Sequence, residues 1–507
     1  MSTAPSTVEA VGPLSAAVAQ LCERLLPQVS EQTAAGFCEV LRRLAAPLQV
    51  AVAGRIKSGK STLVNALIGR RVAPTDVGEC TRLVTRFQYG TVDRVEVVFT
   101  EGARQALPFD AIGMIPADLG IGAALDRVSH LEAYLTNAVL RDLTVIDTPG
   151  LGSMDAAGVA RTEALLDPVS RSAVAGAEAV LYVLTQAVRA DDKQVLAAFT
   201  AATASREAGP VNAVAVLNKA DTIPPESVQG SNGDVWTAAS LLAARQAQVL
   251  RPRVAAVLPM VGLLAETAES GAFTSADADA LRAMASCDEA TRTAMLLSAD
   301  LFTTLDAPVP AGTRTRLLER LDLHGVRVAL DAIDADPHIT AGALRRTLLD
   351  ASGLAALRTR LDAVFRARAD GIKAAAALAS VTALANTSGD QGERQLVHDA
   401  IEVLLQRPQA HQLRLLEALT LVTSGAVAMP DDLADEVVRV GGSSDVAEQL
   451  GMPGRPMAEL AGYALERAGW WRSFASFGAT PAQSRVAHVV HRAYFLIWQR
   501  LREEVRR

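Results

Sequence analysis

The stretch from Gly54 to Thr62, Gly-Arg-Ile-Lys-Ser-Gly-Lys-Ser-Thr, carries two glycines, two lysines and three hydroxyl side chains in nine residues. It matches the phosphate-loop pattern GxxxxGK[ST], with an apolar, strand-like run before it and a helical pattern after it. The glycines permit a tight turn whose backbone N–H groups face phosphates, and the following helix N-terminus adds partial positive charge. The pattern predicts a nucleoside triphosphate site built from Gly54, Lys57, Ser58, Gly59, Lys60, Ser61 and Thr62.

Within this site the residue types divide the work on the phosphates. Lys60 is expected to reach the β- and γ-phosphates, and the Ser61 hydroxyl to ligate Mg²⁺. A second motif, Asp-Thr-Pro-Gly at 147–150, ends an apolar run. Asp147 is expected to hold Mg²⁺ through water, and the Gly150 N–H to contact the γ-phosphate. These residues predict Mg²⁺ as the cofactor.

A third motif, Asn-Lys-Ala-Asp at 218–221, selects the base. Guanine presents two adjacent donors that the Asp221 carboxylate can accept, whereas adenine would leave this carboxylate unmatched in a dry pocket. Asn218 is expected to brace the loop and the Lys219 stem to cover the base. Val261 stands where a further base-contacting loop belongs, although many such loops carry a serine there. The predicted substrate is GTP.

The elements that must position these motifs form one α/β region. Continuous apolar runs bounded by turn residues indicate strands that are covered on both faces, as in a mainly parallel sheet. In such a sheet ligands bind beyond the carboxyl ends of the strands, where all three motifs stand. The predicted strands lie within residues 48–54, 94–100, 143–150, 179–186, 211–221 and 253–260.

Helical spacing of apolar residues dominates both ends of the chain. Residues 15–45 read as helix, divided or kinked at Pro27, and Pro47 ends this pattern. Helical segments follow at 276–305, 314–333 and 340–368, with Thr340 as a plausible N-cap. Residues 371–507 again read as helical. The predicted fold class is therefore an α/β P-loop domain, with helices on both faces of its sheet and an extended helical region built from both chain ends.

Composition bounds the environment and the partners. The net charge is −7, from 49 basic and 56 acidic residues, which disfavours nucleic acid as a partner. The N-terminus lacks a basic start followed by an apolar run, and no stretch reaches about 18 apolar residues. A soluble, cytoplasmic protein is expected.

Taken together, the motifs resemble the dynamin superfamily. The phosphate loop running into 61–69, the segment 79–90, and the motifs at 147–152 and 218–221 are similar to bacterial dynamin-like proteins. Residues 296–310, 316–330 and 352–378 further resemble the actinobacterial, isoniazid-inducible IniC-like type, which is encoded beside a partner dynamin.

The resemblance implies a domain order and a mode of action. It implies neck helices at 1–46, a GTPase domain at 47–370 with a helical insertion at about 266–340, and a helical neck and trunk at 371–507. It also implies Thr81 as the switch threonine, a ligand to Mg²⁺. Nucleotide-dependent pairing is implied too, as a homodimer or with a neighbouring dynamin-like protein. So is peripheral work on membrane lipid at the inner face of the cell membrane.

Two positions depart from the patterns of related GTPases. Leu151 stands where Ras-like enzymes place a water-orienting glutamine, and Lys57 stands where eukaryotic dynamins place a serine. Guanylate-binding proteins resemble the second arrangement, with an arginine finger at that loop position. Two interpretations of Lys57 stay open: a cationic finger that pairing positions, with the Thr81 backbone holding the water, or a solvated lysine on the loop exterior.

The sequence offers two candidate regions for membrane contact. The aromatic cluster 470–474 with Phe477 reads either as an interfacial anchor or as packing of the last two helices against the neck. Residues 421–429 are an alternative trunk-tip loop. Neither carries a polybasic cluster. The function is therefore predicted as a GTPase that remodels, tethers or divides membrane, or alternatively as a GTP-switched scaffold that never touches lipid.

Overall fold

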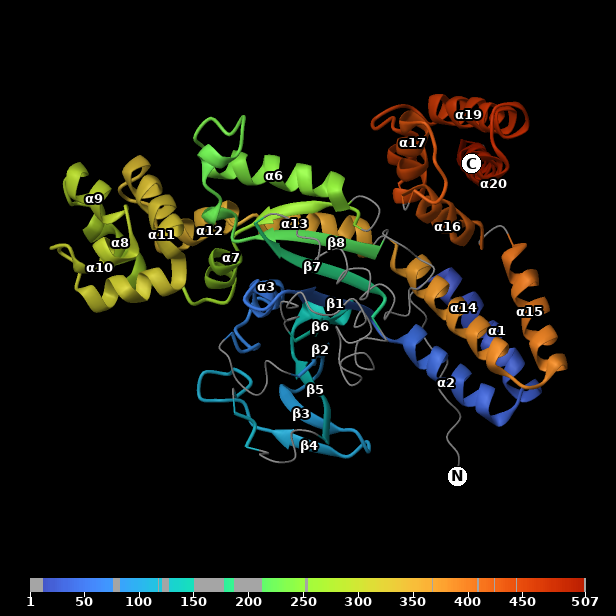
Figure 1. The fold of residues 1–507 in the computed structure, drawn as a ribbon, viewed down its shortest axis with the longest axis horizontal. Helices are drawn as coiled ribbons and strands as arrows, with labels where there is room; N and C mark the ends of the chain where they lie inside the picture. The colour runs from blue at the N-terminus through green and yellow to red at the C-terminus, as the bar shows by residue number, and fades with distance from the viewer. Residues whose placement is uncertain are drawn as a thin grey trace, which may run out of the picture.

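The computed structural model describes residues 12–75, 83–116, 118–120, 127–149, 177–186, 212–250, 254–366, 368–407, 410–423, 425–443 and 445–505. A twisted sheet occupies the centre (Figure 1). A group of short helices lies on one side of it, and long helices from both chain ends lie on the other.

The described strands form one mixed sheet in the order β4-β3-β5-β2-β6-β1-β7-β8-β9. The strands β6, β1, β7, β8 and β9 run parallel to one another, while β3 is antiparallel to both β4 and β5. Their bounds are β1 Leu48–Gly54, β2 Thr85–Tyr89, β3 Arg94–Phe99, β4 Arg104–Leu107, β5 Val128–Leu135, β6 Leu143–Asp147, β7 Ala179–Thr185, β8 Ala213–Asn218 and β9 Val257–Met260.

Alternate residues of the central strands feed two separate cores, which explains their continuous apolar sequences. In β1, Val50 and Val52 face one core, while Ala51 and Ala53 face the other. The helices α3 (Lys60–Ile68) and α13 (Leu354–Leu361) bury apolar side chains in the first core. Helix α6 (Val235–Leu250) covers the second. The sheet is thus covered on both faces, as predicted.

The helices α8 to α12, which follow β9 and α7, form a group that we call the helical insertion, after the segment predicted at about 266–340. Thr340 caps α12, since its side chain accepts the Ala343 N–H at 3.1 Å, as expected from the sequence. The long helix α11 is kinked at Asp322, whose φ of 54° lies in the left-handed region. The bounds are α7 Gly262–Glu269, which precedes the insertion, and then α8 Ser275–Ala285, α9 Glu289–Met295, α10 Ala299–Thr304, α11 Ala311–Ala335 and α12 Ala341–Ala351.

Helices from both chain ends form a bundle, called the neck here. It contains α1 (Pro13–Leu25), α2 (Glu31–Ala45), α14 (Ala369–Thr387) and α15 (Gln391–Leu405). Carboxylates from late in the sequence cap the early helices. Asp370 accepts the Leu14 N–H at 2.9 Å and the Ser15 N–H at 2.7 Å, and Glu393 accepts the Ser30 N–H at 2.8 Å. The two chain ends are therefore joined, as predicted.

The last helices form a second bundle, called the trunk: α16 His411–Thr423, α17 Asp431–Gly442, α18 Val446–Leu450, α19 Met457–Phe477 and α20 Pro481–Val505. Its core holds the fully buried Trp471, whose indole N–H donates to Glu436 of α17 at 3.0 Å. Tyr494 of α20 donates to the same carboxylate at 2.5 Å. Trp471 thus packs inside the trunk, not against the neck, because the polar end of its ring finds a partner there.

A buried ion pair joins the neck to the sheet. Lys373 of α14 is fully buried, and its ammonium lies 3.2 Å from Glu178, just before β7. The same ammonium donates to the Arg43 carbonyl of α2 at 2.7 Å, and Glu178 also accepts the Gln49 N–H at 3.1 Å. Burial raises the pKa of Glu178 and lowers the pKa of Lys373, and the attraction between the two charges opposes both shifts.

The sequence missed three strands. The strands β2 and β4 are short and polar, and β5 (Val-Ser-His-Leu-Glu-Ala-Tyr-Leu) breaks its apolar run with Glu132. Glu132 is buried yet paired with Arg104 of β4 and the Tyr134 hydroxyl, each at 2.6 Å. Because partners from β4 and from β5 itself compensate this carboxylate, a polar sequence folds as strand, which the apolar pattern alone could not indicate.

Replacing Lys373 by Met should leave the Glu178 carboxylate buried without its cation. We expect the free energy of opening of α14, measured by hydrogen exchange, to fall by about 3–5 kcal/mol. The double variant Lys373→Met/Glu178→Gln should recover part of this loss. The control Arg42→Ala breaks an exposed pair with Glu39, at 63% and 51% exposure, and should cost less than about 1 kcal/mol. Equal losses in Lys373→Met and Arg42→Ala would contradict a stabilising role.

Candidate nucleotide-binding site

The phosphate loop connects β1 to α3 and depends on an unusual backbone. Lys57 has a φ of 61° and Gly59 a φ of 89°, both in the left-handed region. A Cβ on Gly59 would lie 2.2 Å from Nδ2 of Asn218, and a Cβ on Gly54 would lie 2.5 Å from the Val183 carbonyl oxygen. Only glycine fits at these two positions, because the loop passes directly over β7 and β8.

Lys60 points back into this loop. It is 7% exposed, and its ammonium donates to the carbonyls of Gly54 at 3.2 Å and Arg55 at 3.0 Å. Burial lowers its pKa, and the nearby Asp147 carboxylate opposes this shift. Among the described residues its hydrogen-bond acceptors are both backbone carbonyls, and such a buried cation is well suited to receive phosphate oxygens.

Ser61 and Asp147, the two described residues that the sequence predicts as metal ligands, lie side by side. The Ser61 hydroxyl donates to Oδ2 of Asp147 at 2.8 Å, whereas the buried Oδ1 of Asp147 has no hydrogen-bond partner within the part of the chain that the structure describes. Burial raises the pKa of Asp147 to about 6. A hydroxyl beside an unsatisfied carboxylate oxygen fits the oxygen ligands that Mg²⁺ requires. Ser61 and Asp147 would hold the ion, and the bound ion would neutralise charge on the phosphates.

Asn218 joins the phosphate loop to the Asn-Lys-Ala-Asp segment at 218–221, called the base loop here. It is 3% exposed at the end of β8, and its amide donates to the Ser58 carbonyl at 2.9 Å. Its Oδ1 accepts the Gly262 N–H, also at 2.9 Å. Asn218 therefore braces three segments of the site, as expected from the sequence.

The other predicted base residues surround Asn218. Lys219 is exposed and adopts a left-handed φ of 57°, and burial raises the pKa of Asp221. Val261 is buried and donates its N–H to the Ser352 carbonyl at 2.9 Å. Two predicted residues, Thr81 and Gly150, lie outside the described residues, as does Leu151.

Sequence reasoning missed two features of this end of the site. Gly262, rather than Val261, contacts Asn218, and a Cβ there would lie 2.8 Å from Oδ1 of Asn218. The charges of Asp322 and His324, at the kink of α11, act on the pKa of Asp221. The glycine after β9 was a usable sequence signal for the contact of Gly262 with Asn218. The effect of Asp322 and His324 on Asp221 had no such signal, because these residues lie about a hundred positions apart.

This arrangement defines a P-loop domain of the GTPase class. The carboxyl ends of its parallel strands present a phosphate loop, an Asp-Thr-Pro-Gly strand end and an Asn-Lys-Ala-Asp loop side by side.

The comparisons with known proteins agree. The dynamin family matches residues 50–220. The isoniazid-induced protein IniC of Mycobacterium tuberculosis is 33% identical over 446 residues, covering 86% of this chain and 87% of that protein. A bacterial dynamin-like protein of Nostoc punctiforme is 30% identical over 116 residues, covering 21% of this chain and 17% of that protein.

A solved structure of an oligomerised bacterial dynamin pair, described as sensing and tethering membranes, is also similar. The match covers 100% of this chain and 79% of the solved chain, at 11% sequence identity. Its TM-score of 0.29 is too low for comparing individual elements. On its sequence relatives, the chain belongs to the dynamin family, in the bacterial IniC-like group, and is a GTPase.

Replacing Asn218 by Ala should weaken GTP binding, because it leaves the Ser58 carbonyl and the Gly262 N–H without their buried partner. At about 1–3 kcal/mol for unsatisfied buried groups, the Kd for GTP should rise about 10- to 100-fold. Titration with a fluorescent GTP analogue measures it. The control Asn386→Ala changes an exposed asparagine near the end of α14 and should leave the Kd unchanged. An unaltered Kd in Asn218→Ala would refute the bracing role.

Proposed function

We propose that this chain couples GTP binding and hydrolysis to remodelling, tethering or fission of membrane, as a peripheral protein at the inner face of the cell membrane. The observation that carries the proposal is an exposed aromatic tip on a helical trunk that the neck connects to the GTPase site. Among the described helices, none combines the length and apolar character needed to cross a bilayer.

In the proposed catalytic cycle Mg²⁺ serves as cofactor. Ser61 and Asp147 (the latter through water), with Thr81 as switch ligand, hold the ion. Lys60 and the Gly150 N–H contact the terminal phosphates. Asn218, Lys219, Asp221 and Val261 form the guanine end. Residues 47–370 act as the GTPase domain, with a helical insertion at about 266–340, and residues 1–46 and 371–507 supply the neck and trunk.

Lys57 is proposed as a cationic finger for hydrolysis. The left-handed backbone at Lys57 costs free energy in a residue with a Cβ, and such strain is retained where function requires it. Its side chain is exposed in the single chain, so it has room to move when two GTPase domains pair, either as a homodimer or with a neighbouring dynamin-like protein. An ammonium near the bridging oxygen would stabilise the charge that develops there.

Replacing Lys57 by Ala should lower the turnover stimulated by pairing about 10²- to 10³-fold, less than an arginine finger supplies, because lysine lacks the bidentate fork. GTP turnover is measured against protein concentration. The neighbouring exposed residue provides the control Ile56→Ala, at 58% exposure, which should keep stimulation. Unchanged stimulation in Lys57→Ala, or a strict requirement of the unaltered protein for K⁺ or Na⁺, would exclude the finger.

The proposed membrane contact lies where α19 meets α20. Phe477 is 93% exposed there, and Trp470, which stacks on Phe474, is 40% exposed. The loop after α16 lies alongside, since Gln483 donates to the Ala428 carbonyl at 2.7 Å. Both sequence candidates for membrane contact therefore meet at one end of the trunk. The buried Trp471 holds this end together and does not take part in the contact.

Replacing Phe477 by Asp should reduce co-sedimentation with anionic liposomes at least about threefold, because a carboxylate opposes insertion into the headgroup region. The control Leu297→Asp alters a residue of the helical insertion that is 72% exposed and should pellet like the unaltered chain. Pelleting is compared without nucleotide and with a non-hydrolysable GTP analogue. If the unaltered chain pellets in neither state, alone or with its partner dynamin, the GTP-switched scaffold replaces the membrane function.

A further inference from the structure

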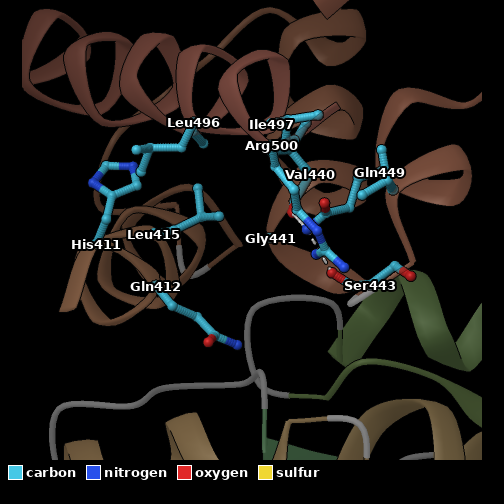
Figure 2. Close-up of a pocket in the computed structure, with 12 residues that line it drawn as sticks. His411, Gln412, Leu415, Val440, Gly441, Ser443, Gln449, Leu496, Ile497 and Arg500 are labelled. Carbon is cyan, nitrogen blue, oxygen red and sulfur yellow. Dashed lines mark hydrogen bonds between the residues drawn. The ribbon is translucent and has the colours of Figure 1, made fainter. Parts of the chain in front are cut away.

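The trunk contains a pocket of about 610 Å³, far from the nucleotide site in sequence. It lies between α16, α17, α18 and α20, and Figure 2 shows Leu496, Ile497 and Arg500 along one side, with His411 and Leu415 at one end. Val440 adds a further apolar wall. Ligand pockets in proteins commonly measure about 300–1,000 Å³ and combine apolar walls with a few polar groups.

His411 supplies one of these polar groups. It is 5% exposed, and its Nε2 lies 2.9 Å from the Val489 carbonyl oxygen, so Nε2 carries the proton and donates it. Its Nδ1 is then an acceptor, and among the described residues it has no partner. Burial lowers the pKa of His411 to about 4, with Arg492 and Arg414 contributing, so the ring is neutral at pH 7. A buried acceptor without a donor calls for an explanation, and a ligand hydroxyl would provide one.

Arg500 supplies a cation at the rim. Its side chain is 65% exposed, and its Nε lies 3.3 Å from Glu504 one helical turn away. Exposed pairs of this kind hold the two side chains only weakly. The guanidinium can therefore turn toward an anionic group of a ligand, which it would bind through two parallel hydrogen bonds.

We propose that this trunk pocket binds an amphiphile with a single acyl chain and an anionic headgroup. The walls Leu415, Val440, Leu496 and Ile497 would cover the chain, and Arg500 would take the anionic group. Where the headgroup carries a hydroxyl, as in a monoacyl phosphatidylglycerol, that hydroxyl would also satisfy His411. The single acyl chain and the anionic group are shared by a free fatty acid and by a monoacyl phospholipid released from a membrane. The proposal does not depend on the tip contact or on GTP hydrolysis.

The pocket lies beside the contact between the trunk and the neck. The Gly442 carbonyl, one residue from the lining Gly441, accepts the Arg368 Nε–H at 2.9 Å. A Cβ on Gly371 of α14 would lie 2.9 Å from Leu416 of α16. The pocket therefore adjoins the contact between trunk and neck, and its occupant would stiffen the segments that make this contact.

The test uses the full chain and two radiolabelled probes, palmitate and monopalmitoyl phosphatidylglycerol, each below its micelle concentration and without vesicles. Equilibrium dialysis should give saturable binding of one probe per chain. Val446→Trp fills the pocket from α18 and should raise the Kd at least about tenfold. Its matched control, Val438→Trp, changes a valine of α17 that is 39% exposed and outside the lining, and should change the Kd less than twofold. Arg500→Gln should raise the Kd severalfold, and Arg502→Gln should not.

The outcomes separate the sources and the alternatives. Binding of palmitate alone identifies a free fatty acid, and binding of the phospholipid, with or without palmitate, identifies a membrane product; both support the pocket. Saturable binding of neither probe overturns the proposal, and so does an equal loss in the two tryptophan variants. If circular dichroism shows that Val446→Trp is unfolded, Leu496→Trp repeats the filling from α20 and decides the result.

Discussion

The ion pair of Lys373 and Glu178 is the constraint on which the arrangement of this molecule depends. It joins α14, α2 and the sheet at one buried point, where removal of either charge would leave the other in an apolar surrounding. The strand that accepts this anchor, β1, begins at Leu48 beside Glu178 and ends at Gly54 in the phosphate loop. Seven residues of strand, about 23 Å at roughly 3.3 Å each, thus separate the neck from the nucleotide phosphates. A buried central strand deforms little, so β1 is a rigid connection between the phosphate loop and the anchor of the neck.

At the carboxyl ends of the strands, the neutral side chain of Asn218 likewise joins separate segments of the chain. Asn218 joins the phosphate loop, the base loop and the start of α7, and two glycines make room for it. The helical insertion reaches the same place, because the kink at Asp322 brings His324 within electrostatic range of Asp221. The nucleotide site is therefore connected to the neck along β1, and it lies within electrostatic range of the helical insertion at Asp221.

Much of this was predictable from the sequence, for physical reasons that also explain the failures. The phosphate loop, Asp147 and Asn218 stand at the ends of strands that are apolar on both faces. The continuous apolar runs predicted these strands, and the motifs at their ends predicted the site. The strand β5 was missed because Glu132 is compensated by partners from β4 and from its own strand. The partnership of Lys373 with Glu178 was equally hidden, because a lysine in an alanine-rich helix reads as solvated until the fold buries it. The role of Gly262 was not predictable from side-chain patterns, because its contribution is a backbone N–H.

The neck also dictates an order of events during synthesis. The second of the two early helices, α2, ends at Ala45. Both α1 and α2 pack against α14, which ends only at Thr387. Between these points lie 387 − 45 = 342 residues, which a ribosome translates in about 17 to 70 s at roughly 5 to 20 residues per second. Throughout this interval Leu21, Leu25 and Phe37 have no α14 to cover them. The apolar faces of these two segments are therefore buried against α14 only after most of the chain has been made.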